Sequence, residues 1–438
     1  MKALNVSSAP LLESVQEDRL LRKVSKRLLP LLFVSYIIAY IDRVNLGFAK
    51  LQMLDDLHFS AAVYGLGSGI FFIGFILFEV PSNLIFYRVG ARFWISRIMI
   101  TWGAISIATL FVKTPEMFYV SRFLLGAAEA GFTPGVIYYL TQWYPQRRLG
   151  RVISTLIAAT AVGGILVGPL SGWMMGAFEN VGSLRNWQWL FLLQGAPAIV
   201  IGFMVWFFLD NSPKEAAWLN DAERAQLRAI VDADRAPEHQ RARISDALRE
   251  SRVWLLGLVL IAANLGAYSV VFWTPTIVKA AGFHQYGSIG LISAIPYATA
   301  AAGMLLLGQS SDFFRERRWH IAGACMTGAL GLLISILFHS SPWLSIAGIS
   351  IATGAFVGST PIIWAFASNF FTDRAAATCL ALMNALGALG GFFGPYAMGL
   401  AQNLTGSTVV SMLAIAGWAV AGGFLILALP SPRRLRRG

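Results

Sequence analysis

An almost uninterrupted apolar segment, LLPLLFVSYIIAYIDRVNLGF, occupies residues 28–48 near the beginning of the sequence. At roughly 20 residues, this segment is long enough to cross a lipid bilayer as a helix. Asp42 and Arg43 lie inside it, although an ionised side chain at bilayer depth costs at least about 2.5 kcal/mol. Charged residues at this depth usually face a cavity and mark the path of an ion or a substrate. We therefore expect the rest of the chain to be organised around this pair.

The composition extends this interpretation to the whole chain. Of its 438 residues, 56% are apolar and only 13% are charged, whereas about a quarter are charged in a typical soluble domain. The mean hydropathy is +0.63. The hydropathy pattern predicts an all-α membrane protein with twelve transmembrane helices. The predicted spans are residues 28–49, 62–86, 93–112, 117–142, 152–177, 187–209, 253–279, 287–309, 320–339, 343–368, 376–401 and 408–429.

Positive charges are distributed unevenly about these spans. Two of the 34 Lys and Arg residues lie within spans, and four (Lys50, Lys113, Arg185 and Lys279) fall on one side; the others fall on the side of the two termini. The positive-inside rule therefore predicts that both termini are cytoplasmic. The net charge of +12 then reflects topology and attraction to anionic lipid, so nucleic acid is not an expected partner.

One long polar segment, residues 210–251, divides the chain into two halves. Ser212, Pro213 and Glu215 have the pattern of an N-cap, a first-turn proline and a capping-box acid, so we expect a surface helix to begin there. The predicted organisation is a cytoplasmic N-terminal tail (1–27), a six-helix bundle (28–209), a cytoplasmic linker (210–251), a second six-helix bundle (252–429) and a basic C-terminal tail (430–438).

The two halves have matching sequence features at a nearly constant offset. Gly131-Phe-Thr-Pro134 corresponds to Gly358-Ser-Thr-Pro361, Arg147 to Arg374, and Gly163-Gly164 to Gly390-Gly391. This pattern resembles the two six-helix pseudo-repeats of the major facilitator fold, which binds its substrate between the halves. The loop from Gly308 to Arg318 also resembles that superfamily's Gly-xxx-Asp-Arg-x-Gly-Arg-Arg motif. Its conformational residues would be Asp312 and Arg315, and Arg88 in the first half, where Tyr87 replaces the motif's aspartate.

Five ionisable residues lie well within the predicted spans, all in the first half: Asp42, Arg43, Glu79, Arg122 and Glu129. Tyr36, Tyr40 and Arg43 share one helix face, and a guanidinium matches a carboxylate or phosphate in geometry. We therefore interpret Arg43 as an anion-binding residue; the alternative is that it only neutralises Asp42. The second half offers polar and aromatic groups instead: Asn264, Tyr268, Trp273, Trp364 and Asn384.

Arg122 and Glu129 also share a helix face, and Glu129 lies among small residues that allow close helix packing. A carboxylate held away from water in this way can exchange a proton near neutral pH. The alternative is a fixed structural bridge between these two residues. Glu79 is either a third proton site or, as we prefer, a group that caps the backbone freed by Pro81.

Four segments resemble the anion:cation symporter family of the major facilitator superfamily. They are Tyr40-Ile-Asp-Arg-Val-Asn45, Phe75-Ile-Leu-Phe-Glu-Val-Pro-Ser-Asn83, the run from Arg122 to Gly131, and the run from Asn384 to Gly391. The sequence around Glu79, Glu-Val-Pro-Ser-Asn, resembles that of the branch that contains the tartrate, phthalate, hydroxyphenylacetate and nicotinate permeases.

The resemblance implies particular roles for these residues. Asp42 and Glu129 would carry protons, Arg122 would modulate Glu129, and Arg43 and Tyr40 would meet a substrate carboxylate opposite Trp364 and Asn384. Two departures from the sugar-acid branch, Phe75 in place of a tyrosine and Pro361 in place of a serine, argue for a less hydroxylated or aromatic acid.

The expected function is proton-coupled import of a small organic carboxylate by a monomeric, multi-pass secondary transporter of a bacterial inner membrane. The sequence has no phosphate-binding loop, nucleophile triad or metal-ligand spacing, so an enzyme, a cofactor or a metal is not expected. Three alternatives remain: an organic-anion exchanger, a drug efflux antiporter and a non-transporting sensor. The second is suggested by the pattern Gly164-xxx-Gly168-Pro-xx-Gly172, which we interpret as a helix-packing feature.

Overall fold

The computed structural model describes residues 9–179, 181–234, 244–371 and 376–429, and within them every regular element is a helix. Arg374 and the predicted tail 430–438 lie outside the described residues. The helices are α1 (Ala9–Val44), α2 (Leu46–Leu57), α3 (Ala61–Val89), α4 (Ala91–Ala108), the 3₁₀ turn η1 (Thr109–Phe111), α5 (Pro115–Glu129), α6 (Phe132–Thr141), α7 (Gln146–Ala177), α8 (Asn186–Phe208), α9 (Asp221–Ala233), α10 (Ile244–Arg249), α11 (Ser251–Ala280), α12 (Tyr286–Phe313), α13 (Arg318–Leu337), α14 (Pro342–Ala367), α15 (Ala376–Thr405) and α16 (Val409–Ala428).

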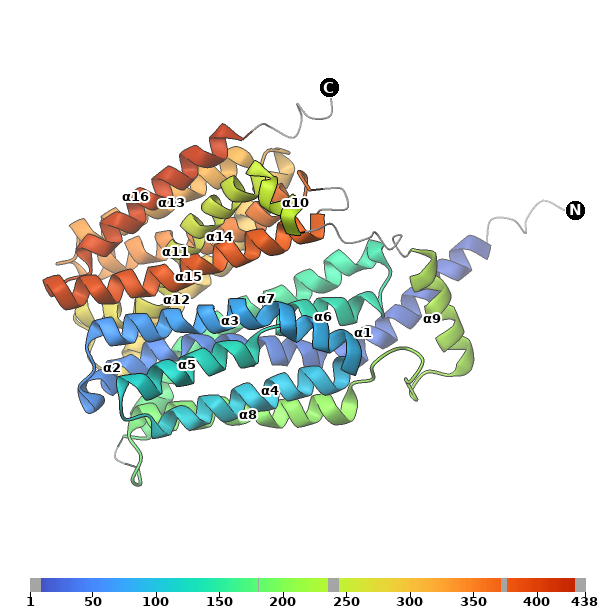
Figure 1. Ribbon diagram of the computed structural model, residues 1–438, viewed down its shortest axis with the longest axis horizontal. Helices are drawn as coiled ribbons and strands as arrows, with labels where there is room; N and C mark the ends of the chain where they lie inside the picture. The colour runs from blue at the N-terminus through green and yellow to red at the C-terminus, as the bar shows by residue number, and fades with distance from the viewer. Residues whose placement is uncertain (1–8, 180, 235–243, 372–375, 430–438) are drawn as a thin grey trace, which may run out of the picture.

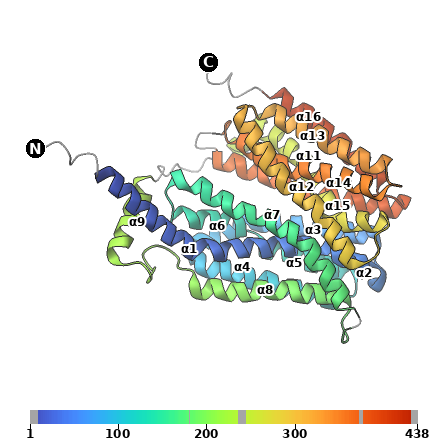
Figure 2. The ribbon, with the colours of Figure 1, turned by 180° about the vertical axis from the view of Figure 1, so that it is seen from behind.

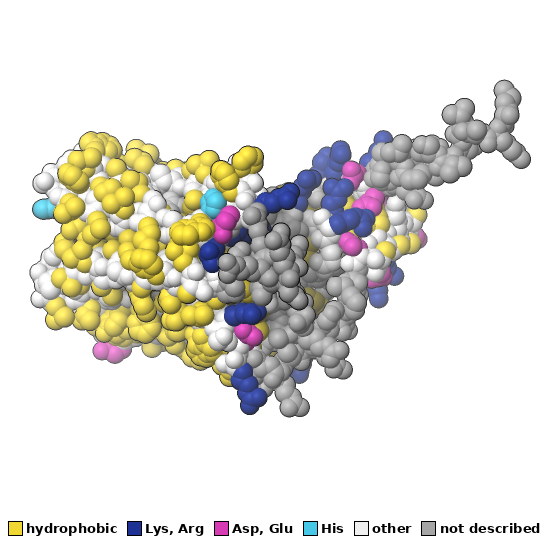
Figure 3. All heavy atoms as spheres, turned by 90° about the horizontal axis from the view of Figure 1, so that it is seen from above, with side chains coloured by type: hydrophobic (Ala, Val, Ile, Leu, Met, Phe, Trp, Pro, Cys, Tyr) yellow, Lys and Arg dark blue, Asp and Glu magenta, His cyan; other side chains and the backbone are white. Residues whose placement is uncertain are grey.

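The helices form two bundles that lie side by side, α1–α8 and α11–α16 (Figures 1 and 2). Helices α9 and α10 and both ends of the described chain lie at the same end of the molecule, which we call the terminal side; the opposite end is the far side (Figure 1). Apolar side chains cover most of the face in Figure 3, whereas Lys and Arg gather toward the terminal side. This is the surface expected of a protein that crosses a bilayer.

In the described residues, eleven helical segments are long and apolar enough to cross a membrane. The predicted fourth span, 117–142, is the exception because it consists of two short helices, α5 and α6. The chain leaves the helix at Ala130, and Gly131 has a φ of +86°, which glycine adopts without the cost that a side chain would bring. The pair α5–α6 is therefore the twelfth crossing, and our expectation of one continuous helix there was wrong.

The linker helix also differs from the expectation. Residues 212–215 form a turn, and α9 begins at Asp221 with Asn220 as its N-cap and Glu223 completing the capping box. The Lys23 ammonium lies 2.7 Å from Glu223 and holds the pKa of that carboxyl below its usual value. Since Lys23 belongs to α1, which begins at Ala9, the linker is attached to the terminal end of the first helix.

The structure shows an ion pair in the predicted conformational loop of the second half, between α12 and α13. Asp312 pairs with Arg317 at 3.2 Å rather than with Arg315, because Arg315 occupies the turn after α12 with a φ of +50°. Arg88 is exposed at the end of α3.

The two bundles press together most closely on the far side, through glycines. A Cβ at Gly65 of α3 would lie 2.7 Å from the carbonyl oxygen of Pro395 in α15. Gly168 and Gly172 of α7 meet Gly290 of α12 with equally little space. The glycine pattern of α7 therefore has a structural role in this state, as interpreted from the sequence: it lets the two backbones approach.

Gly290→Val is expected to hold the far side apart, because the new side chain would collide with the backbone of Gly168. Spin labels at His58 and Thr405, exposed far-side positions of the two bundles, should report a longer distance than in the otherwise unchanged chain. Gly287→Val, also in α12 but with no neighbour within 4 Å, is the matched control. Equal distances in both variants would contradict the role of the glycine contact.

Candidate functional site

A cavity of about 320 Å³ lies between the two bundles and receives side chains from both. Arg43 is the only cation among its lining residues and Glu79 the only acid. Two amides and several aromatic rings complete the wall. The lining residues are Arg43, Phe71, Phe72, Phe75, Glu79, Thr133, Pro134, Ile137, Asn264, Tyr268, Asn384 and Ala388.

Arg43 forms an ion pair with Glu129. Its Nη2 lies 2.5 Å, and its Nε 3.2 Å, from the same carboxylate oxygen, Oε2. The pair forms because α1 ends at Val44 and α5 ends at Glu129, which brings the two helix ends together. An acid at a helix C-terminus is unfavourable, and the guanidinium compensates for it. The Arg43 side chain keeps 25% exposure whereas Glu129 keeps 1%, so the cation faces the cavity and the acid lies behind it.

The break between α5 and α6 holds Glu129 in place. The Ser82 hydroxyl donates to the carbonyl oxygen of Ala130 at 2.6 Å, and the Trp94 indole donates to the Ser82 oxygen at 3.0 Å. The other carboxylate oxygen of Glu129, Oε1, is buried without a hydrogen-bond partner among the described residues.

Asp42 and Arg122 lie deeper in the first bundle, each about 1% exposed. Asp42 Oδ1 accepts hydrogen bonds from Ser106 at 2.5 Å and Asn45 at 3.3 Å. Its Oδ2, and the Nε and Nη2 atoms of Arg122, have no hydrogen-bond partner in the described part of the chain. Arg122 lies over the ring of Phe71 at 5.2 Å.

These contacts answer two alternatives left open by the sequence. Within the described ranges, neither an Arg43–Asp42 nor an Arg122–Glu129 ion pair is formed, and the partner of Arg43 is Glu129. The seven-residue spacing had suggested that Arg122 faces Glu129. Seven residues correspond to about 10 Å of helix, and the acid pairs instead with Arg43 of α1.

Glu79 joins the two bundles across the cavity. The Asn384 amide donates to both of its carboxylate oxygens, at 3.1 and 3.3 Å. Helix α3 continues past Pro81 to Val89, so our preferred interpretation of Glu79 as a cap for a freed turn was wrong. The residue lies in the cavity and binds an amide of the opposite bundle.

Three of the predicted binding residues do not line the cavity. Tyr36 packs on Phe132, with ring centroids 5.1 Å apart, and Tyr40 packs against Gly163 and Gly164 of α7. Trp364 packs against a separate apolar cluster of the second bundle. Four other predicted site residues do line the cavity: Arg43, Phe75, Glu79 and Asn384.

Sequence reasoning did not single out Phe71, Phe72 and Thr133, which also line the cavity. The two phenylalanines lie in an apolar run without polar neighbours, so periodicity alone could not separate a cavity wall from a packed core. Thr133 follows the helix break at Gly131, and that break was the missing signal.

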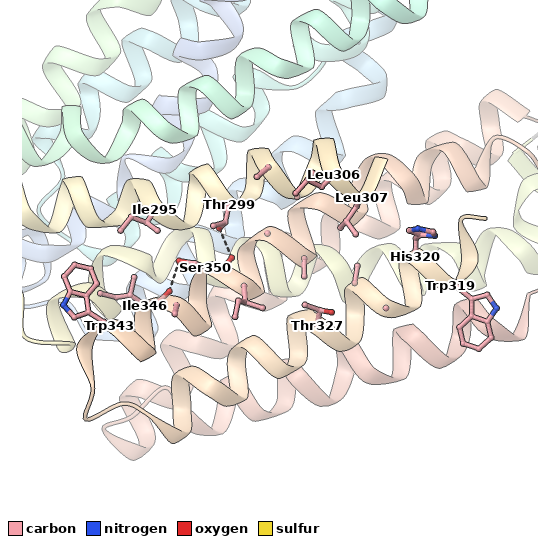
Figure 4. A pocket seen from close by; sticks show the side chains of 18 residues that line it. Ile295, Thr299, Leu306, Leu307, Trp319, His320, Thr327, Trp343, Ile346 and Ser350 are labelled. Carbon is pink, nitrogen blue, oxygen red and sulfur yellow. Dashed lines mark hydrogen bonds between the residues drawn. The ribbon is translucent and has the colours of Figure 1, made fainter. Parts of the chain in front are cut away.

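A larger groove of about 940 Å³ lies on the second bundle between α12, α13 and α14 (Figure 4). Trp343 lies at one end of it, and Trp319 and His320 at the other. Leu306, Trp319 and Trp343 on its wall are largely exposed, as expected of a surface against lipid chains. Its wall has no acid or arginine, so its size does not make it the site for a charged substrate.

Comparison with known proteins agrees with this architecture. Residues 32–395 match the family described as Major Facilitator Superfamily. A protein named as a metabolite transport protein, NicT, of Pseudomonas putida is 44% identical over 93% of this chain and 94% of its own length. A protein of Agrobacterium vitis named as a tartrate transporter is 40% identical, over 94% and 95% of the two chains. A quinolone resistance transporter of Acinetobacter baumannii is 37% identical, over 90% and 91%.

The chain is a transporter, not an enzyme, and it belongs to the major facilitator superfamily. The relatives are consistent with the branch that the motifs indicated, the anion:cation symporter family, so the predictions of family and fold are confirmed.

Proposed function

We propose that this protein imports a small organic carboxylate together with protons, by alternating access of the cavity between its two bundles. The observation that carries the proposal is the Arg43–Glu129 ion pair, in which the cation faces the cavity and the acid is buried behind it. A guanidinium is the side chain best suited to a planar carboxylate.

Coupling follows from competition for one guanidinium. The Glu129 carboxylate occupies Nε and Nη2 of Arg43, which are the atoms that a substrate carboxylate would use. A proton on Glu129 removes its charge and releases Arg43, so that the substrate anion can take its place. Loss of the proton restores the internal pair and expels the anion. Proton and substrate therefore bind together and leave together.

Asp42 is proposed as a second proton carrier, and Arg122 as the cation that offsets its negative charge. The five groups Asp42, Arg43, Glu79, Arg122 and Glu129 have a net charge of −1 when all are ionised. A bound monoanion adds another negative charge, and excess charge away from water is costly. The loaded state should therefore take up about two protons, which makes uptake of a monoanion electrogenic.

The orientation of the chain sets the direction of access. We place both termini in the cytoplasm of a bacterial cell, with one chain as the working unit, because positive charge gathers on the terminal side. The glycine contacts close the far side, and the two bundles diverge toward the terminal side (Figure 1). The state described here is then the inward-facing one.

The cavity wall favours a substrate with an aromatic or weakly hydroxylated body. Phe71, Phe72 and Phe75 share the cavity wall with Arg43, and the second bundle adds the Tyr268 ring with its hydroxyl and the amides of Asn264 and Asn384. Flat apolar rings offer stacking rather than the many hydrogen bonds that a sugar acid needs. The relative named as a tartrate transporter supports an organic acid as cargo.

The test is uptake into proteoliposomes with an inward proton gradient, using labelled nicotinate, phthalate, hydroxyphenylacetate, tartrate and a sugar acid. Accumulation of one acid, with inward positive current, is the expected result. The quinolone relative makes drug efflux the second candidate. Efflux would appear as gradient-driven extrusion of quinolones from the same vesicles with no movement of any carboxylate, and that outcome would refute the proposal.

Asn384→Asp is expected to lower uptake by about 100-fold at neutral pH, because it places two carboxylates opposite each other at the Glu79 contact. Acidification should restore uptake more steeply than in the original chain, since one shared proton rebuilds the hydrogen bond. Asn384→Ala removes the amide without adding charge and should cost about tenfold with no such recovery. Uptake rates across a pH series check both, and parallel pH profiles of the two variants would contradict the contact's role.

A further inference from the structure

Lys50 is buried on the far side, and no counter-ion for it lies among the residues that the structure describes. It belongs to α2, is 6% exposed, and its Nζ has no hydrogen-bond partner among the described residues. The ammonium lies 3.0 Å from the ring centroid of Trp273 and 4.7 Å from that of Tyr64. Two aromatic faces attract a cation electrostatically, but they satisfy none of its three N–H donors.

The aromatic cage around Lys50 is divided between the two bundles. Lys50 and Tyr64 belong to the first bundle, whereas Trp273 belongs to α11 of the second. The Tyr64 hydroxyl donates to the carbonyl oxygen of Phe272 at 2.9 Å, and a Cβ at Gly47 would lie 2.9 Å from the same oxygen. These contacts belong to the closed far side. When the bundles separate there, Trp273 leaves with α11 and uncovers the ammonium.

A layer of aromatic rings separates this lysine from the cavity. Tyr64 and Trp273 have ring centroids 5.8 Å apart, Tyr268 and Phe272 6.3 Å, and Phe72 and Tyr268 4.6 Å. Phe72 and Tyr268 in turn line the cavity that holds Arg43. Lys50 follows Arg43 by seven residues, about two helical turns. The two cations therefore lie at opposite ends of this series of aromatic rings.

We propose that Lys50 is an outer anion site, which receives the substrate carboxylate when the far side is open and passes it to Arg43. This step rests on the proposed function. The carboxylate and the Trp273 ring need the same ammonium, so they exclude each other. Once the anion has moved to Arg43, Lys50 is free to be covered by Trp273, and the far side closes only behind a substrate that has left it. Because no acid in the described part of the chain pairs with Lys50, its charge stays available for an external anion.

The experiment compares the two directions of transport in right-side-out and inside-out membrane vesicles. Lys50→Met is expected to raise the KM for entry from the far side by about tenfold, the loss of one charge-assisted hydrogen bond, and to leave the KM for entry from the terminal side within about twofold. Added salt should raise the far-side KM of the original chain but hardly that of the variant. Lys50→Arg, which keeps the charge, should retain most of the far-side affinity.

Lys279→Met is the matched control. Lys279 is another far-side lysine, exposed and 3.5 Å from the carbonyl oxygen of Leu51, so its loss removes the same charge without touching the cage. Both KM values should stay near those of the original chain. An equal rise in KM in both directions, or the same far-side rise in Lys279→Met, would overturn the outer site. A Trp273→Leu variant with the same two KM values as Lys50→Met would also overturn the outer site, because Lys50 would then act only by holding the closed far side together.

Failure of the proposed function would give a different result from failure of the outer site alone. If the proposed function is wrong, the original chain moves no carboxylate in either direction, and the outer site falls with it. If the original chain transports a carboxylate and Lys50→Met leaves the far-side KM unchanged, only the outer site is wrong.

Discussion

Arg43→Ala is expected to lower kcat/KM for carboxylate uptake by at least about 100-fold, because it removes a charge-assisted pair of hydrogen bonds to the anion. It also leaves the Glu129 carboxylate buried without its partner, which costs about 3–5 kcal/mol unless the acid takes up a proton. Arg43→Lys keeps the charge but loses the two-pronged geometry, and should recover only part of the rate. Initial uptake rates over a range of substrate concentrations measure both effects.

The double variant Arg43→Ala, Glu129→Gln separates binding from folding. It removes both members of the ion pair, so the stability lost in Arg43→Ala should largely return. Exchange of labelled for unlabelled substrate, which needs no proton on Glu129, should remain as low as in Arg43→Ala. Recovery of exchange in the double variant would show that Arg43 only neutralises Glu129 and has no task in binding the substrate.

Glu129→Gln is expected to abolish accumulation driven by a proton gradient while preserving exchange of labelled for unlabelled substrate. Glutamine cannot carry a proton, so the competition for Arg43 is fixed in the substrate-binding state. The concentration ratio across the membrane should fall to about 1, whereas the exchange rate should change by less than about fivefold. Proteoliposomes loaded with substrate give the exchange rate, and empty ones with an inward proton gradient give accumulation.

Glu116→Gln is the control for this substitution, since Glu116 lies in the first turn of the same helix and away from the cavity. It should behave as the original chain in both assays. If Glu129→Gln still accumulated substrate, proton coupling would have to reside elsewhere, and Asp42 would be the next residue to test.

Much of the architecture was predictable because hydropathy and charge are local properties of the sequence. A segment must be apolar over about 20 residues to cross a bilayer, so spans such as residues 253–279 and 287–309 could be located within a few residues of α11 and α12. The helix breaks were harder. Gly131 and the short α5 and α6 sit inside one continuous apolar stretch, and hydropathy does not record where a backbone leaves the helix.

The candidate site was predictable in its residue types but not in its pairs. Arg43, Glu79 and Glu129 were singled out because a charge inside a span is costly and is kept for a reason. Their partners come from other helices: Arg43 meets Glu129 across 86 positions, and Glu79 meets Asn384 across 305. Arg122 and Glu129 both belong to α5 and share a face, but seven residues correspond to about 10 Å of helix. The acid instead pairs with Arg43 of another helix.

Lys50 is another residue whose environment the sequence did not predict. By sequence position it belonged with the charges outside the spans, because it follows the first apolar run. In the structure it is buried under Trp273, a residue more than 200 positions away. The sequence by itself determined the membrane class, the two-fold repeat and the set of intramembrane charges, since these depend on composition and order. Only the tertiary structure decided which charges meet, which face the cavity and which lie beneath aromatic rings, because helix ends and the contacts between bundles set those distances.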